Sequence, residues 1–155
     1  MTFRVREDAL KWFSELAADH TIWDFYYFCL MPGLASGRKR DPTEGRIPTR
    51  EMIDRFIDSY KPAQQLIIGL LIEAELQKAD IDPSEKASVR GVIRRLIAAD
   101  GPTGLTQVGM DTMNAYASGG YEFLSQSRET KPRSSEEFHR DFVRIMAEAV
   151  EARAA

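Results

Sequence analysis

The chain has 155 residues, with 21 lysines and arginines against 24 aspartates and glutamates, and a net charge of −3 at pH 7. Hydrophobic residues make up 43% and charged residues 29%, proportions typical of a globular protein, which argues against disorder of the whole chain. The acidic balance excludes a nucleic-acid binder with a uniformly basic surface, but it leaves a local basic patch open.

The sequence carries no feature of a secreted or membrane protein. A single cysteine, Cys29, allows no intrachain disulfide, which favours a reducing compartment. The N-terminal residues are charged from the start and lack the apolar run of a signal peptide. The longest apolar stretch, residues 66–72, is too short to span a bilayer. We therefore expect a cytoplasmic protein without a membrane partner.

The N-terminal third predicts two helices. Residues 6–18 place apolar side chains on one helical face, with charged residues outside it. Thr21 can cap a second helix over residues 22–31, which is apolar nearly all round and is therefore the expected centre of the core. Pro32 and Gly33 are expected to end that helix.

The next segment alternates between loop and helix. Residues 37–48 contain two prolines and two glycines, and they predict the one long loop of the chain. Thr49 is expected to cap a helix over residues 50–60. Pro62 suits the first position of another helix that reaches about residue 79.

The central and C-terminal parts are also expected to be helical. The sequence Asp-Pro-Ser-Glu at residues 82–85 has the pattern of a capping box and predicts a helix to residue 100. A weaker helix over residues 106–117 is expected to break at the glycine pair 119–120, before a short helix over residues 121–126.

A polar segment, residues 127–134, is expected to link to the last helix, which Ser134 or Ser135 would cap. No segment shows the strict alternation of a strand hairpin. The sequence therefore predicts an all-α fold. We expect a single compact domain over residues 1–155, with about six to eight helices in an orthogonal or bundle-like arrangement and no significant sheet.

The polar residues form no catalytic or metal-binding motif, so we predict no catalytic residue, no metal site and no cofactor. The only histidines, His20 and His139, stand in no metal-ligand spacing. His20 follows Asp19 at a helix end, where contact with the helix dipole is the simplest role. Asp19, His20 and Asp24 form the one cluster from which a small enzyme site could be built.

The first feature that indicates a function is the basic loop. Residues 37–50 carry five basic residues against Asp41 and Glu44, a local charge of +3 in a chain whose total is −3. Such a loop can bind a phosphate backbone, although a charged loop can also be only solvated. The five basic residues are Arg38, Lys39, Arg40, Arg46 and Arg50.

The second feature lies in residues 81–105, which loosely resemble a helix-turn-helix. That resemblance implies a recognition helix from which four side chains point toward bases and phosphates: Ser88, Arg90, Arg94 and Arg95. The helix before the turn is longer than usual, and no β-wing is expected after it. In the alternative, Arg90 and Arg94 form ion pairs with Glu85, Glu73 or Glu75.

Three hypotheses follow. We favour a non-enzymatic helical subunit of a larger assembly, with other subunits or a second copy as partners and nucleic acid bound through the basic patches. An accessory component of a bacterial DNA-processing or defence machine would have these features. The alternative is a protein–protein adaptor or oligomerising scaffold without nucleic-acid contact, which the large apolar residues on short helices indicate: Phe123, Leu124, Phe138 and Phe142. The third hypothesis is a small enzyme with a site near His20.

Overall fold

The computed structural model describes residues 1–154, and in that range it contains six α-helices and one small two-stranded sheet. Strands β1 (Arg4–Arg6) and β2 (Thr49–Glu51) pair antiparallel, with Val5 opposite Arg50. The predicted all-α fold is therefore confirmed. The helices are α1 (Glu7–Trp12), α2 (Ile22–Ser36), α3 (Gln64–Lys78), α4 (Lys86–Leu96), α5 (Gln107–Gln126) and α6 (Ser135–Ala154).

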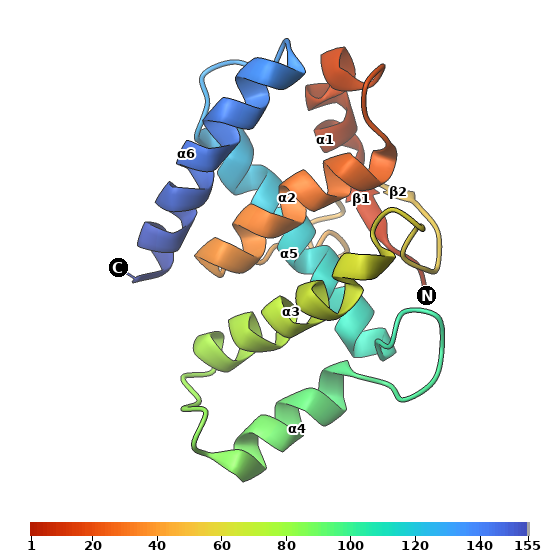
Figure 1. The fold of residues 1–155 in the computed structure, drawn as a ribbon, viewed down its shortest axis with the longest axis vertical. Coiled ribbons are helices and arrows are strands. Elements are labelled where there is room, and N and C mark those ends of the chain that lie inside the picture. Colours follow the sequence, from red (N-terminus) through yellow and green to blue (C-terminus); the bar gives the residue numbers. More distant parts are fainter. Residues whose placement is uncertain (155) are drawn as a thin grey trace.

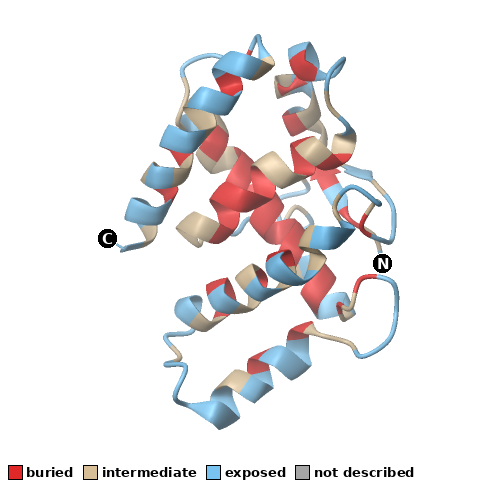
Figure 2. Cartoon of the chain, in the orientation of Figure 1, coloured by how far each residue is buried: buried red, intermediate tan, exposed pale blue. Residues whose placement is uncertain are grey.

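Helices α2 and α5 cross at the centre of the molecule and are its most buried elements (Figures 1 and 2). Glycines let their backbones touch. A β-carbon at Gly120 would lie 1.7 Å from the carbonyl oxygen of Cys29, and one at Gly33 would lie 2.0 Å from that of Tyr116. The crossing thus requires glycine at both positions, because any other residue would force the helices apart.

Both predicted breaks at this crossing are wrong. Helix α2 continues through Pro32 to Ser36, and Gly37, with a left-handed φ of 75°, ends it. Helix α5 runs unbroken through the glycine pair 119–120. The preference of glycine and proline for turns is outweighed here by close tertiary packing of the two helices.

The predicted helix over residues 50–60 is also wrong. Strand β2 occupies its start because β1 offers backbone partners, and the amide of Met52 donates to the carbonyl oxygen of Phe3 over 2.8 Å. The rest of the segment is irregular, but Phe56 is still buried, with its ring 5.2 Å from that of Trp23. Burial of an apolar side chain here does not need a helix.

Helices α1 and α6 occupy one end of the molecule (Figure 1). Helix α1 is shorter than predicted and is followed by a 3-10 turn, Ser14–Leu16. Thr21 caps α2 as expected, and the amide of Glu137 donates to the Ser134 hydroxyl at the start of α6. No helix among residues 1–154 has the length and apolar character that crossing a membrane requires.

Helices α3 and α4 form a hairpin at the opposite end (Figure 1). A 3-10 turn that contains Pro62 precedes α3, close to the predicted start. Helix α4 is shorter than predicted at both ends. Asp82 accepts hydrogen bonds from the amide and hydroxyl of Ser84 in a local turn before the helix. At its other end, Ile97 is extended and pairs with Leu105.

Candidate nucleic-acid interface

The basic loop, residues 37–48 with the adjoining Arg50, lies against α5. The Arg40 amide donates to the carbonyl oxygen of Ala115 over 2.9 Å. Arg38 donates to Glu122 over 3.2 Å and to the Gln126 amide oxygen over 2.9 Å. The Arg40 guanidinium is 3.9 Å from Glu122. Much of the positive charge at the start of this loop is therefore matched by acceptors on α5.

Glu122 also binds Arg6 of strand β1, over 2.8 Å, so three arginines surround one carboxylate. Burial alone would raise the pKa of Glu122, but the hydrogen bond from Arg6 and the charges of Arg6 and Arg38 outweigh burial and lower that pKa. Arg6 has a second partner in Asp8. This cluster fastens β1 and the basic loop to α5.

A buried carboxylate holds two more of the predicted cations. Glu75 of α3 is 4% exposed and accepts from the Lys39 ammonium over 3.0 Å, from Arg95 over 3.1 Å and from the Tyr116 hydroxyl over 2.7 Å. Burial alone would raise the pKa of Glu75, but the hydrogen bonds from Tyr116 and Lys39 outweigh burial and lower it. Lys39 and Arg95 are thus held in a contact that joins the loop, α3, α4 and α5.

The remaining two loop cations differ in their surroundings. Arg50 is 3.5 Å from Glu7. Arg46 adopts a left-handed φ of 52° and has no ion pair within 4.0 Å among the described residues. It lines a small pocket of about 280 Å³ together with Arg4, Asp41 and Asp111, in which positive and negative side chains balance. The loop therefore exposes less free positive charge than its sequence indicates.

Helix α4 carries a row of basic side chains that form no ion pair among the described residues. Residues Lys86–Leu96 include four basic residues and no acidic residue. Lys86, Arg90 and Arg94 are exposed, and none of them has an ion pair within 4.0 Å in the described part of the chain. The alternative in which Arg90 and Arg94 pair with Glu85, Glu73 or Glu75 is not what the structure shows, because Glu75 takes Arg95 instead.

Spacing explains why these three side chains share one face. Lys86, Arg90 and Arg94 recur every four residues, so they project from the same side of α4 over about 12 Å. We call them the α4 cation row. Arg90 and Arg94 were predicted from the sequence but Lys86 was not, although its four-residue spacing from Arg90 could have revealed it. Figure 2 shows the outer surface of α4 as mostly exposed.

The other side of α4 is firmly held. Val92 and Leu96 are buried, and the Thr106 hydroxyl donates to the carbonyl oxygen of Arg95. A β-carbon at Gly109 would lie 2.1 Å from the carbonyl oxygen of Leu96, so α5 begins in direct contact with the end of α4. The C-terminal half of α4, which carries Arg94, is thus packed against α5, and the cation row lies on a helix rather than on a loop.

Comparison with known proteins gives no family for this arrangement. Searches against protein-family models, curated proteins and solved structures find no match to this chain. The connection between α3 and α4 spans residues 79–85, seven residues, whereas a helix-turn-helix has a turn of about three or four. The loose resemblance to that motif therefore does not extend to its geometry.

Among the described residues, no hydrogen bond or ion pair joins the three members of the predicted cluster, Asp19, His20 and Asp24. Asp24 accepts from the Thr21 amide over 2.8 Å and from the Tyr60 hydroxyl over 2.6 Å, so both of its oxygens are engaged. His20 does line an open cleft of about 460 Å³, and its Nε2 atom is 3.4 Å from that of His139. Among residues 1–154, no group of three or more His, Cys, Asp or Glu side chains is arranged to hold a metal ion.

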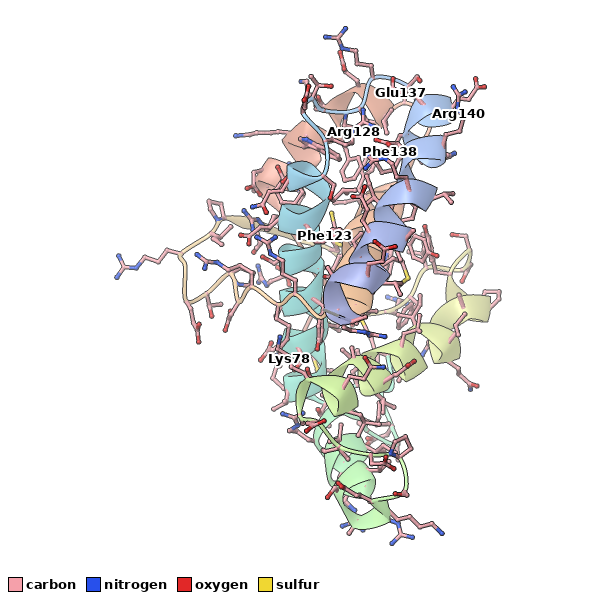
Figure 3. The ribbon with its side chains drawn as sticks, turned by 90° about the vertical axis from the view of Figure 1, so that its left-hand side faces the viewer. Lys78, Phe123, Arg128, Glu137, Phe138 and Arg140 are labelled. Atoms are coloured by element: carbon pink, nitrogen blue, oxygen red, sulfur yellow. The ribbon has the colours of Figure 1, made fainter. Side chains whose placement is uncertain are left out.

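The apolar residues that indicated an adaptor are largely inside the protein. Leu124 and Phe138 are buried, while Phe123 and Phe142 are half-buried against the core. Arg128 reaches from the segment after α5 to Glu137 and Asp141 of α6 (Figure 3). These residues explain how α6 is attached to the rest of the fold.

Proposed function

We propose that this protein is a non-enzymatic, nucleic-acid-associated subunit that binds the phosphate backbone through the α4 cation row. The observation that carries the proposal is the contrast between two sets of basic residues. Those of the loop are mostly taken up by Glu122, Glu75 and Glu7, whereas Lys86, Arg90 and Arg94 are exposed and have no ion pair within 4.0 Å in the described residues.

The charge distribution supports the same orientation. Helix α4 carries +4 and the whole chain −3, which leaves −7 on the remainder. A polyanion would be repelled by the net negative charge of the remainder and attracted by the cation row itself, which Asp80, Asp82 and Glu85 precede in the chain. Each phosphate contact would release counterions, so binding would fall steeply with salt and would depend little on base sequence.

Because α4 is packed against the rest of the fold, it favours binding to the surface of a duplex over binding to a flexible single strand. Because Val92 and Leu96 anchor the helix, the row presents three cations at fixed spacing without an ordering cost in the backbone. Contacts of this kind position a protein on a duplex and carry no direct sequence information. We therefore expect duplex binding of low specificity, with sequence choice left to partner subunits.

The test is a triple alanine variant of the row measured by fluorescence anisotropy on a labelled duplex, at about 50 and about 200 mM salt. Loss of three phosphate contacts should reduce the slope of log affinity against log salt by about 2–3 and weaken binding at low salt. The matched control removes three exposed cations from the segment before α6 and the start of α6, at the end of the molecule opposite α4 (Figure 1): Lys131, Arg133 and Arg140. The proposal is contradicted if both variants lose the same affinity for the duplex, or if the row variant loses none.

One observation favours a protein partner as well. Val143 and Val150 lie seven residues apart on α6 and are 72% and 54% exposed, on the face that points away from α2. A second candidate function is therefore association through α6. Light scattering of the purified chain decides it, because a monomer at all concentrations would remove self-association as the reason for these exposed valines.

A further inference from the structure

The only two histidines of the chain, 119 residues apart, meet at the end of the molecule where α1 and α6 lie. His20 belongs to the turn before α2, and His139 lies in the second turn of α6. Their Nε2 atoms are 3.4 Å apart and their rings are nearly perpendicular, at 82°. Neither the hydrophobic core nor the proposed phosphate contact uses this pair.

The backbone fixes the proton on His20. Its Nδ1 atom is 3.1 Å from the carbonyl oxygen of Leu16, and a carbonyl can only accept, so Nδ1 carries the hydrogen. The neutral ring then has a free lone pair on Nε2, directed toward His139. A carbonyl bound to the far nitrogen is the arrangement that orients histidine ligands in metal sites.

We propose that His20 and His139 together bind a divalent transition-metal ion of the zinc–copper class through their Nε2 atoms. Two nitrogens at about 2.05 Å from a tetrahedral zinc ion lie about 3.3 Å apart, close to the separation found here. Imidazole is a ligand that zinc, copper and nickel share. Because the described residues offer no third protein ligand, water completes the coordination sphere.

The proton balance is simple. In the metal-free pair, the Nε2 hydrogen of His139 donates to the lone pair of His20. When the metal enters, that hydrogen moves to Nδ1 of His139, and both neutral rings donate a lone pair with no net proton release. The aromatic rings of Phe25 and Phe28 back the pair, at 5.8 Å and 5.7 Å from His20.

One side of the pair is open to solvent. His20 lines the cleft of about 460 Å³, whose walls include Leu10, Ala17 and Phe25. His139 is exposed on α6. An ion can therefore enter without unfolding, and an exchangeable water can remain on it. Binding would tie the start of α6 to the turn before α2, where the Ser135 hydroxyl and Asp19 already meet over 3.4 Å.

The experiment titrates the tag-free, full-length chain with Zn²⁺ or Ni²⁺ in calorimetry, alongside His139→Gln and His20→Gln. We expect one metal ion per chain, and at least tenfold weaker binding in either variant than in the wild type. The control is Arg140→Ala, which alters the residue next to His139 and should bind like the wild type. Thermal unfolding in EDTA checks that each variant folds.

Equal affinity in the wild type and both histidine variants would overturn the proposal, as would one metal ion shared by two chains. If His20→Gln does not fold, His139→Gln decides alone, because that side chain is exposed. Co²⁺ absorption gives an independent reading: a tetrahedral visible band that disappears in His139→Gln supports the site, and a band that remains there refutes it.

Discussion

Glu75 is the residue whose removal should reveal most about how the fold is held together. Its carboxylate is 4% exposed and accepts three hydrogen bonds, two of them from cations. Glu75→Gln keeps the size of the side chain and removes the charge. Lys39 and Arg95 are 31% and 49% exposed, so each can regain water, and we assign about 0.5–1 kcal/mol to each lost ion pair.

The expected destabilisation by Glu75→Gln is therefore about 1–2 kcal/mol, because the amide oxygen can still accept from Tyr116. Glu75→Ala also leaves the Tyr116 hydroxyl without its acceptor and opens a cavity, so about 3–5 kcal/mol is expected. The assay is urea unfolding of both variants. Glu73→Gln is the matched control, because Glu73 is exposed on the same helix and should change stability by less than about 0.5 kcal/mol.

The dependence on pH gives a second readout. Because the pKa of Glu75 is lower in the folded protein than in the unfolded chain, its stabilising effect is present above the unfolded pKa, about 4.3. That effect is lost as the pH falls through the folded pKa. The stability gap between the wild type and Glu75→Gln should thus be constant near neutral pH and shrink below about pH 4. A gap under about 0.5 kcal/mol at neutral pH, or one that does not change in acid, would refute this reasoning.

Three further predictions concern two glycines and the buried cysteine. Gly120→Ala should destabilise the protein by at least about 2 kcal/mol, because the new methyl group would strike the carbonyl oxygen of Cys29. Gly91→Ala, on the open side of α4 with no atom within 4 Å, should instead stabilise it by about 0.5–1 kcal/mol. Urea unfolding measures the change in stability of each variant. Changes of the same sign would contradict the close helix contact at Gly120. Burial raises the pKa of the Cys29 thiol, so Ellman's reagent should react only after denaturant is added; rapid reaction of the native protein would show that the thiol is accessible.

Local signals predicted a large part of the fold. The apolar segment after Thr21 forms the central helix, and Thr21 caps it with Asp24 as its partner. The helix after Pro62 and the last helix also lie close to their predicted places. These elements were predictable because hydrophobic periodicity and capping residues act within a few residues of the chain.

The candidate site could be predicted only in part, since an ion pair depends on what lies across from it. The loop cations Arg38 and Lys39 are equivalent in sequence to any exposed basic residue, yet Glu122 and Glu75 come from distant helices to bind them. Arg90 and Arg94 were correctly placed on a helix, but only the tertiary fold shows that, among the described residues, neither forms an ion pair within 4.0 Å.

Sequence alone therefore determined the helical class, the apolar segments and several helix starts, because these follow from interactions between neighbours in the chain. Only the tertiary structure places Gly33 and Gly120 where two helix backbones meet. The glycines therefore form a helix crossing and do not end their helices. It also decided which charges are neutralised and which stay free, and that His20 meets His139. Those outcomes depend on distances between residues far apart in the chain, which no local pattern encodes.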